Sequence, residues 1–433
     1  MDKKETIEGF YKLSRQEKIA LLNLSNESKK LLYDALITEP KIAGIIDELS
    51  ENTISHYSFP MGVAPNVWIN NKLYTLPLVT EESSVVAAIA KAAKFWAAYG
   101  GFQATVLGTK KKGQVHFFWK GEKSLLINKF DALKDFILFR IRPYIRRMQK
   151  RGGGISNIEL VDKTAILDNY YQLDVSFETL DAMGANFINS CLEDMAKSLR
   201  QFVSCDLEMD ENLLEINMAI LSNYTPNCRV KAWASIPIAD LNRYGDQLNI
   251  SNLASKLEHA VAIASIDVGR AVTHNKGIFN GIDAVALATG NDWRALEAGA
   301  HAYASRKGSY ASLSKVAMNN TSFTIELEIP LAVGTVGGIT NLHPLAKIAM
   351  EILGKPGAEE LMQIMAVSGL AANLSALLAL TTSGIQKGHM SMHLSNILRQ
   401  LDATEEQKEA AKNFFKEKTI SYSEVAEFLK SYS

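Results

Sequence analysis

Two kinds of hydrophobic pattern alternate along the 433 residues. In "YYQLDVSFET" (170–179) apolar and polar residues alternate strictly, which predicts a β-strand with one buried face. Further strands are expected at 229–238 and 322–333. The segment 83–98 is rich in alanine, has apolar residues at helical spacing and ends before two glycines, as a helix does. The chain is therefore predicted to mix helices and strands.

Residues 107–221 show a regular order of predicted elements that sets them apart from the flanking chain. The order is strand, helix, two strands, helix and a final strand. This split β-α-β-β-α-β arrangement is typical of ferredoxin-like domains and predicts a compact domain inserted into a larger one. The predicted strands are 114–120, 158–161, 170–179 and 213–222, and the predicted helices are 182–200 and 124–148, which Pro143 can bend.

Composition and charge narrow the class of protein. The chain is 47% hydrophobic and has a net charge of −1 without a long basic run. These values fit a globular protein of two or three domains, and they lack the electrostatic footprint of a nucleic-acid binder. The three cysteines, Cys191, Cys205 and Cys228, have no metal-ligand spacing, so we expect no metal site and a reducing compartment.

Two segments bear on membrane attachment. The first thirty residues are polar and lack the apolar core of a signal peptide. The most apolar region, 361–385, contains Gln, Ser, Gly and Asn at intervals. Small residues of this kind suit a tightly packed buried helix better than a lipid span. We therefore expect a soluble cytoplasmic protein without membrane contact.

Two glycine clusters, "RGGGIS" (151–156) and "GTVGGIT" (334–340), raise the question of a dinucleotide site. Neither has the G-x-G-x-x-G spacing or the strand-turn-helix context of a Rossmann unit. Taken alone, each predicts a tight turn. A nicotinamide cofactor would therefore need a different scaffold.

The segment "DAMGAN" (181–186) follows a predicted strand and opens a helix. Asp181 is placed to cap that helix, and the backbone N–H groups of Met183 and Gly184 are expected to point outward. Such a helix end attracts anions, including a pyrophosphate, but a plain Asp cap explains the same residues.

Four charged or titratable residues stand in unusual surroundings. Glu82 precedes the helix at 83–98, where it complements the helix dipole. Lys276 in "VTHNKGIFNG" and Asp292 in "ATGNDWRA" flank a stretch that is too apolar to be a solvated surface. His389 begins the more polar C-terminal region, as either an ordinary polar residue or a general acid on a hinged segment.

As a set, these motifs are specific. The segments "EESSVVAA", "DAMGAN", "RAVTHNKGIFNG", "ATGNDWRA", "GTVGG" and "KGHM" occur in an order and spacing that resemble hydroxymethylglutaryl-CoA reductases over nearly the whole chain. "THNKG" and "TGNDWRA" are similar to the soluble class II enzymes. The resemblance implies an α+β fold with a large mixed helix/strand substrate domain (1–106 and 222–379), an inserted ferredoxin-like cofactor domain (107–221) and a mobile helical C-terminal flap (380–433).

The resemblance also implies a reaction, the four-electron reduction of 3-hydroxy-3-methylglutaryl-CoA to mevalonate and CoA. The matching catalytic residues are Glu82, Lys276, Asp292 and His389. A buried cation stabilises the charge that develops on a thioester carbonyl oxygen, and a nearby carboxylate keeps a buried lysine protonated. We therefore expect a buried Lys276 beside Asp292. Glu82 is expected to protonate the second intermediate, mevaldehyde, and His389 to protonate the CoA thiolate.

Binding residues follow from the same resemblance. Ser84 and Arg270 match positions that hold the free carboxylate of the substrate, and Asn280 has a supporting polar role. The family implies a homodimer whose active site is built from both subunits. The residues expected to line the cofactor in the inserted domain are Asp181, Met183, Gly184, Asn186 and Asn223.

One departure bears on the choice of cofactor. NADH-using relatives carry an acidic residue just before "GGG", where this chain has Ile145, Arg146 and Arg147. A carboxylate suits a free ribose 2′-hydroxyl, whereas arginine suits a 2′-phosphate. We therefore predict NADPH, with NADH as the alternative, and flux toward mevalonate as in isoprenoid biosynthesis. A solvated basic face is the simpler explanation of these arginines.

Two other functions compete with this prediction. One is the reverse, NAD-dependent oxidation of mevalonate, and the other is an acyl-CoA thioester hydrolase or binding protein. Because a hydrolase needs no dinucleotide, the inserted domain and "DAMGAN" favour the reductase.

Overall fold

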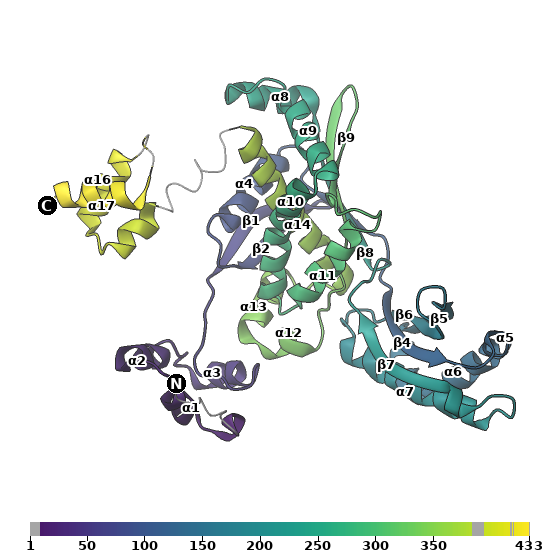
Figure 1. Cartoon of the computed structure of the whole chain (residues 1–433). Coiled ribbons are helices and arrows are strands. Elements are labelled where there is room, and N and C mark those ends of the chain that lie inside the picture. Colours follow the sequence, from purple (N-terminus) through teal and green to yellow (C-terminus); the bar gives the residue numbers. More distant parts are fainter. Residues whose placement is uncertain (1–8, 383–393, 416–417, 419, 433) are drawn as a thin grey trace.

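The computed structural model describes residues 9–382, 394–415, 418 and 420–432, and Figure 1 shows how their elements are arranged. The chain begins with a small helical unit, drawn in purple. Ser14, Ser25 and Glu39 cap its three α-helices by accepting from the backbone N–H three residues on. The elements are η1 (Phe10–Lys12), α1 (Arg15–Leu21), α2 (Asn26–Asp34) and α3 (Pro40–Asp47).

The main body contains an antiparallel hairpin and an antiparallel sheet of order β3-β8-β10-β9. Neighbours β3 and β8 are separated in sequence by the whole of residues 107–228. The chain between them therefore leaves the body and returns, as predicted. The strands are β1 (Met61–Ile69), β2 (Lys72–Val79), β3 (Gln103–Val106), β8 (Arg229–Pro237), β9 (Ser314–Met318) and β10 (Ser322–Pro330).

One helix, α14, runs through the centre of this body. It is long and apolar enough to cross a membrane, but 72% of its most apolar window is buried inside the protein. A helix that is apolar all round and covered by its own chain is a core helix, which confirms the prediction for its part of 361–385. The helices of the body are α4 (Val85–Ala97), α8 (Ile238–Gln247), α9 (Leu253–Ile266), α10 (Val268–Ala288), α11 (Trp293–Ala304), α12 (Gly338–Leu342), α13 (Pro344–Ile352) and α14 (Ala358–Thr381).

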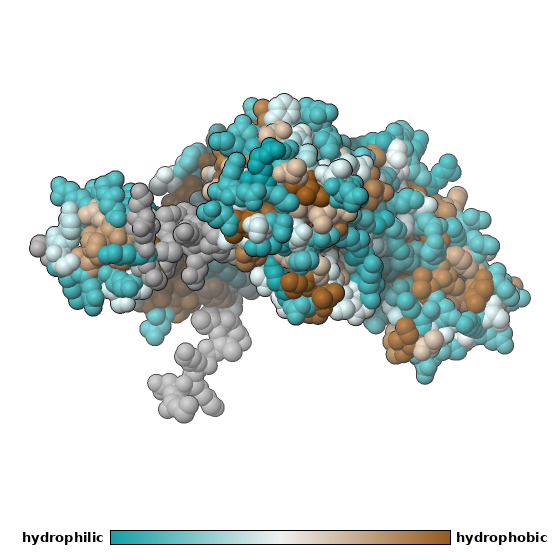
Figure 2. Space-filling model, turned by 90° about the horizontal axis from the view of Figure 1, so that it is seen from above, coloured by the Kyte–Doolittle hydropathy of each residue, from teal (hydrophilic) through white to brown (hydrophobic). Residues whose placement is uncertain are grey.

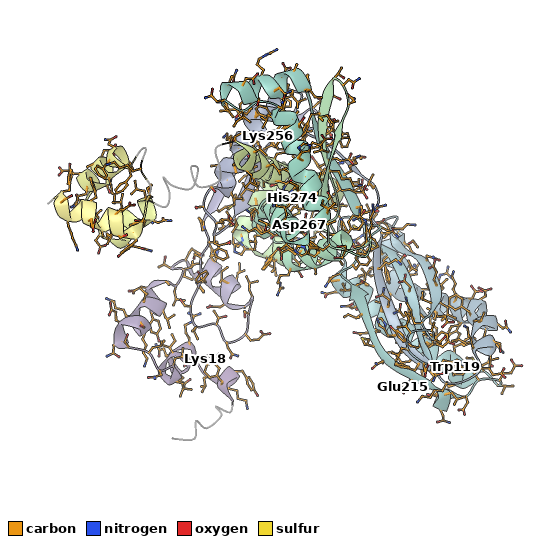
Figure 3. All side chains as sticks on the ribbon, turned by 45° about the horizontal axis from the view of Figure 1, so that its top comes forward. Lys18, Trp119, Glu215, Lys256, Asp267 and His274 are labelled. Carbon is orange, nitrogen blue, oxygen red and sulfur yellow. The ribbon has the colours of Figure 1, made fainter. Side chains whose placement is uncertain are left out.

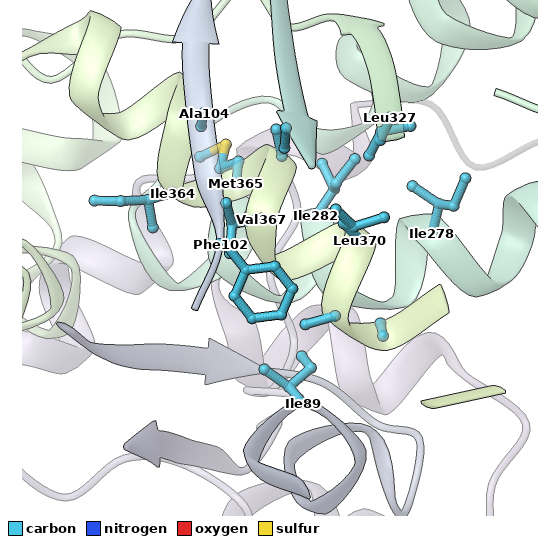
Figure 4. Packing of buried hydrophobic residues seen from close by; sticks show 14 of the residues in the cluster. Ile89, Phe102, Ala104, Ile278, Ile282, Leu327, Ile364, Met365, Val367 and Leu370 are labelled. Atoms are coloured by element: carbon cyan, nitrogen blue, oxygen red, sulfur yellow. The ribbon is translucent and has the colours of Figure 1, made fainter. Parts of the chain in front are cut away.

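Helices α10 and α14 approach each other closely. A Cβ atom added to Gly281 of α10 would overlap the Ser368 carbonyl of α14, and Ser368 Oγ donates to the Gly281 carbonyl at 2.9 Å. Figure 4 shows Ile282 and Leu370 in the apolar core at this crossing. Because glycine lets the backbones touch, α10 is held rigidly against the core.

The inserted segment forms a second antiparallel sheet, of order β5-β6-β4-β7, and α6 and α7 pack against it. Its elements follow the predicted β-α-β-β-α-β order, with a short additional helix before α6. Pro143 lies inside α6 without ending it. The elements are β4 (Lys111–Trp119), α5 (Lys123–Asn128), α6 (Phe130–Gln149), β5 (Gly154–Asp162), β6 (Tyr170–Glu178), α7 (Ala185–Cys205), η2 (Glu211–Leu213) and β7 (Leu214–Ser222).

The C-terminal part, drawn in yellow in Figure 1, contains α16 (Glu405–Phe414) and α17 (Tyr422–Ser431). Its buried side chains form a hydrophobic cluster of their own, as do those of the body and of the inserted sheet. Three separate clusters fit the expected division into a body, an inserted domain and a flap. The exact boundaries at 107–221 and 380–433 stay predictions.

Candidate active site

A cavity of about 410 Å³ lies between the start of α4, one face of α10 and the end of α14. Five of the residues singled out in the sequence line it. Glu82 and Ser84 come from the segment before α4, and Arg270, Lys276 and Asn280 come from α10. Residues three or four apart share a helix face, so Asn280 lies beside Lys276, and Thr273 and Gly277 connect Arg270 to Asn280 along the wall of the cavity. The structure thus brings together the predicted catalytic lysine, one predicted acid and the three predicted substrate-binding residues.

Lys276 and Glu82 form an ion pair at this cavity, although 194 positions separate them in the sequence. Lys276 Nζ donates to Glu82 Oε2, and the two side chains are 58% and 35% exposed. The expectation of a buried lysine is therefore wrong for the single chain, because solvent reaches the ammonium group. An ion pair this exposed adds little to stability, so its position at the cavity is its notable property.

Asp292 has other partners than Lys276 among the described residues. Its Oδ1 accepts from Ala295 N at 3.1 Å and so caps α11. Lys276 lies in the middle of α10, and the helix runs on to Ala288, about 18 Å further along the axis at 1.5 Å per residue. Within one chain Asp292 thus follows the end of α10 and is not among the residues that line the cavity, so its pairing with Lys276 stays a prediction for a site built from two subunits. The carboxylate beside the lysine is the one that precedes α4.

Ser84 holds an unusual backbone conformation. Its φ of 76° lies in the left-handed region, which residues with a side chain seldom adopt. Helix α4 begins only after it, at Val85, so the predicted start at 83 is two residues early. Strained residues of this kind gather at functional sites. Here the turn leaves both Glu82 and Ser84 on the wall of the cavity.

A buried polar network supports α10 behind the cavity. His274 Nε2 lies 2.6 Å from Ser314 Oγ, which donates to Asn373 Oδ1 at 3.3 Å, and Asn373 Nδ2 donates to the His274 carbonyl at 3.2 Å. This ring joins α10, β9 and α14; Figure 3 labels His274 in the body. Burial, with a smaller effect of Arg270, lowers the pKa of His274 to about 3, so its imidazole is neutral. The sequence analysis missed this network, although polar residues inside apolar helical patterns are its signal.

The "DAMGAN" segment forms a turn between the inserted sheet and the body. Asp181 Oδ1 accepts from Ala358 N at 2.8 Å, so it caps the start of α14. Helix α7 begins at Ala185, with Gly184 as its N-cap and no side-chain cap. The prediction that Asp181 caps the helix that follows it in the sequence is therefore wrong. Its carboxylate instead ties the turn to the core helix of the body.

The second glycine cluster packs against the same turn. Ala182 forms a β-bridge with Val336, and Thr335 N donates to the Asp181 carbonyl at 2.8 Å. A Cβ atom on Gly334 would overlap the Met183 backbone nitrogen. The first glycine of "GTVGG" therefore permits a close approach of two backbones and makes no cradle of its own.

The remaining predicted cofactor residues lie at or near the start of α7. Gly184 has a φ of 89°, and a Cβ atom there would lie 2.5 Å from Thr179 Cγ2. Met183 and Asn223 line a small pocket between this turn and α11, and Asn186 is exposed on the first turn of the helix. Because no side chain caps α7, its first backbone N–H groups are available to an anion.

Comparison with known proteins agrees with this geometry. Residues 14–394 match the family described as hydroxymethylglutaryl-coenzyme A reductase. A 3-hydroxy-3-methylglutaryl-coenzyme A reductase from Archaeoglobus fulgidus is 35% identical over 409 residues, which cover 92% of this chain and 88% of the relative. This chain belongs to the hydroxymethylglutaryl-coenzyme A reductase family.

Solved structures of the family are similar as well. The class II reductase from Streptococcus pneumoniae, bound to NADPH in open conformations, aligns with a TM-score of 0.72 and 37% identity over 87% of this chain and 99% of that one. A second structure of the Streptococcus pneumoniae enzyme aligns with the same TM-score and 35% identity, over 98% of this chain and 99% of that one. The mixed helix and strand fold is therefore that of class II reductases.

Three other residues predicted from the reductase motifs have a less defined place. His389 lies outside the described residues. Arg146 and Arg147 are exposed in the last turn of α6. A Cβ atom on Gly153, just beyond that turn, would lie 2.6 Å from the Glu178 carbonyl, so the end of α6 lies close to the strand that leads into the "DAMGAN" turn. Within the described ranges, no cluster of His, Cys, Asp and Glu could hold a metal ion.

Asp283 is a carboxylate that the sequence analysis missed in this reductase. It lies on α10 seven residues after Lys276, two turns along the same face. Its Oδ1 is buried and has no hydrogen-bond partner among the described residues. Burial raises its pKa to about 8, with smaller contributions from Glu297 and Glu81. Its only signal in the sequence is one acid in the apolar stretch "IDAVALATG".

Proposed function

We propose that this chain catalyses the reduction of 3-hydroxy-3-methylglutaryl-CoA to mevalonate and CoA with two molecules of NADPH. The observation that carries the proposal is the cavity in which Glu82, Ser84, Arg270, Lys276 and Asn280 meet. It combines a cation for a developing oxyanion, an acid and groups for a carboxylate. Family membership and the NADPH-bound structure of a 37% identical reductase support the same reaction.

Substrate binding is assigned to the α10 face and the turn before α4. The guanidinium of Arg270 and the hydroxyl of Ser84 hold the free carboxylate of the substrate, because these groups donate hydrogen bonds that suit a carboxylate. Asn280, one turn from Lys276, supports the polar end. Lys276 Nζ then faces the thioester carbonyl. The ammonium group stabilises the oxygen as it becomes negative, and electrostatic stabilisation of this kind often lowers a reaction barrier more than any other single effect.

Proton transfers complete each half of the reaction. NADPH supplies a hydride to the carbonyl carbon in each half when it is bound. In the first half the C–O bond regains its double bond, the C–S bond breaks, and His389 protonates the leaving CoA thiolate. In the second half Glu82 protonates the oxygen of the reduced aldehyde. Asp292 keeps Lys276 protonated. For this role, Asp292 of one chain must lie beside Lys276 of a second chain.

The cofactor site is assigned to the turn before α7. Asp181, Met183, Gly184 and Asn186 line the dinucleotide there, with Asn223 near the nicotinamide. The uncapped start of α7 suits a pyrophosphate, and Gly184 leaves room for close approach. Arg146 and Arg147, near the same turn at the end of α6, are proposed to bind the 2′-phosphate and so to favour NADPH over NADH. Steady-state rates with each cofactor test this preference.

The assembly is proposed to be a cytoplasmic homodimer. The exposure of Lys276 and the position of Asp292 outside the cavity both call for a second copy of the chain. Large apolar side chains are exposed on α10 and on α12–α13, and Figure 2 shows several apolar patches on the face that it draws. Exposed apolar surface of this kind marks interaction sites. The exposed apolar residues are Val268, Val272, Leu342, Leu345 and Ile348.

The decisive experiment follows the loss of reduced-nicotinamide absorbance when 3-hydroxy-3-methylglutaryl-CoA is added. Wild type is compared with Lys276→Ala and with Lys256→Ala, a control on an exposed position of α9 that Figure 3 labels. Lys276→Ala is expected to lower kcat at least about 10²-fold, the size of effect seen when one oxyanion donor is removed. The control is expected to retain full activity. Unchanged turnover in Lys276→Ala would refute the role of the lysine, and no turnover in wild type would refute the function.

A further inference from the structure

Lys111 is a buried lysine for which the reaction above has no use. It is the first residue of β4 and is only 4% exposed. Its Nζ donates to Thr179 Oγ1 at 2.6 Å and to the Ala182 carbonyl at 2.9 Å. Both of these acceptors are neutral. Among the described residues, Lys111 forms no ion pair at salt-bridge distance. Burying an ammonium group without a partner charge is costly, so a lysine in this place calls for a functional explanation.

Both of these side-chain hydrogen bonds of Lys111 fall on the turn that carries "DAMGAN". Thr179 Oγ1 also donates to the Ala182 carbonyl, at 2.7 Å, so the lysine and the threonine together close the turn. The methyl group of Thr179 fills the space that a Cβ atom on Gly184 would need. The carbonyl that the ammonium group contacts, that of Ala182, is therefore only three positions before Ala185, the uncapped start of α7.

We infer that Lys111 is the positioning residue of the cofactor site, fixing the turn at 179–184 and placing a positive charge beneath the anion-binding start of α7. The inference rests on the proposed function, because it takes the pyrophosphate of NADPH as the anion. The ammonium group acts through the turn that it fixes, and Lys111 also lines the small pocket that contains Met183 and Asn223. The ammonium group holds the Ala182 carbonyl away from the anion. Its positive charge also adds to the positive end of the helix dipole of α7. Salt screens a buried charge only weakly.

The surroundings of Lys111 make its charge sensitive to pH. Burial lowers the pKa of Lys111, while Cys228, Glu178 and Asp181 oppose this shift. The Cys228 thiol is itself neutral near pH 7, because burial raises its pKa to about 11. The charge beneath the turn is therefore lost at a lower pH than for a lysine in water. NADPH should bind more weakly as the pH rises through this range.

The experiment measures NADPH binding to the full chain by the fluorescence of the reduced nicotinamide, without substrate, and then KM and kcat separately. Lys111→Met keeps the length of the side chain and removes its charge. Lys120→Met, at the other end of β4, is the control, because Lys120 is 55% exposed and pairs with Glu215 at 3.4 Å. Figure 3 labels Glu215 at the far end of the inserted unit.

Lys111→Met is expected to weaken NADPH binding by about tenfold or more, the range for a lost hydrogen bond to a charged group. KM for NADPH should rise while KM for 3-hydroxy-3-methylglutaryl-CoA stays the same, and the decline of affinity at alkaline pH should disappear. Lys120→Met should match wild type in all of these. A folded Lys111→Met protein with wild-type affinity and wild-type pH profile would overturn the inference.

A second variant covers the case in which Lys111→Met does not fold. Thr179→Val keeps the volume of the side chain and the charge of Lys111 but removes the hydroxyl that links it to the turn. A smaller loss of NADPH affinity, with the pH dependence retained, is expected. Unchanged affinity in Thr179→Val would contradict the positioning role. If wild type itself fails to bind NADPH, the proposed cofactor is wrong, which is a different result from either.

Discussion

Lys276 and Lys111 are both proposed to stabilise negative charge, but their surroundings within one chain differ strongly. Lys276 is 58% exposed and pairs with a carboxylate at the mouth of a cavity. Lys111 is 4% exposed, and neutral acceptors of a single turn hold it. The difference indicates that the fold of one chain completes the cofactor turn. The reaction site is more exposed in one chain, which agrees with the proposal that a second copy and the C-terminal flap contribute to it.

The largest expected effect tests the open site. Glu82→Gln keeps the shape of the side chain and removes both its charge and its proton. Because Glu82 is the proposed proton donor and the contact of Lys276, kcat is expected to fall about 10²- to 10⁴-fold, the range for general acid catalysis. NADPH affinity should not change, since the cofactor turn is elsewhere. Steady-state kinetics measure kcat, and nicotinamide fluorescence measures the affinity for NADPH.

The matched control for that variant is Glu215→Gln, on the exposed end of the inserted unit. It should behave as wild type in both assays, because the side chain of Glu215 is 63% exposed and its carboxylate pairs with Lys120. Equal rates for Glu82→Gln and wild type would remove Glu82 from the chemistry. The ion pair with Lys276 would then be an ordinary surface interaction.

A second prediction tests whether Lys276 and Asp292 of one active site come from two different chains. Lys276→Ala and Asp292→Ala are each expected to be nearly inactive. Mixed dimers of the two variants contain one site with both residues intact if Lys276 of one chain works with Asp292 of the other. The purified mixed dimer should then recover about half of the wild-type activity, because one of its two sites is intact. Co-expression with two purification tags gives the mixed species.

If the two residues act within one chain, every site in the mixed dimer carries one defect and activity stays at background. The control is a mixture of Lys276→Ala with Lys276→Ala carrying the second tag, which should remain inactive under either arrangement. Size-exclusion chromatography establishes that the mixed species is dimeric. Background activity in a stable mixed dimer would contradict the two-chain site.

The same contrast explains what the sequence could predict. Local patterns were enough for the order of strands and helices in 111–222, and for the buried helix α14. Motif spacing was enough to name Glu82, Arg270 and Lys276, which meet in one cavity. The motifs do not show which residues of distant segments contact each other in the folded chain.

For that reason the partners were predicted less well than the residues. Asp181 was expected to cap the adjacent helix, but it caps α14, 177 positions away in the sequence. Asp292 was assigned to Lys276, but within one chain it is not among the residues that line the cavity. Lys111 attracted no attention, because it lies before the strand predicted at 114–120 and a lysine in such a segment is usually solvated. Its burial depends on where the inserted sheet meets the body, and this is a property of the tertiary fold.

A third prediction concerns a substitution that disrupts the cofactor turn. Gly184→Ala places a Cβ atom 2.5 Å from Thr179 Cγ2 and forces a side chain into the left-handed region at a φ of 89°. The turn must shift, so NADPH binding is expected to weaken about tenfold, in line with strain of about 1–2 kcal/mol. Gly152→Ala is the control, since it has a φ of 95° but nothing within 4 Å of its added Cβ atom. Titration of NADPH distinguishes the two; equal affinities would mean that contact with Thr179 is unimportant.

The last expected effect is on the stability of the fold, at Asp283 of α10. Its pKa is raised to about 8, first by burial and then by Glu297 and Glu81, so it keeps its proton in the folded state while it loses it in the unfolded state from about pH 4 upward. The folded state therefore binds more protons across this range, and the stability that Asp283 contributes below pH 4 is lost as the pH rises toward 8. Asp283→Asn imitates the protonated form at every pH, so its melting temperature should vary less between pH 5 and 8 and exceed that of wild type at pH 8. Parallel melting curves would show that Asp283 is ionised in the folded protein, and that the buried end of the α10 face is as open to water as the end that carries Lys276.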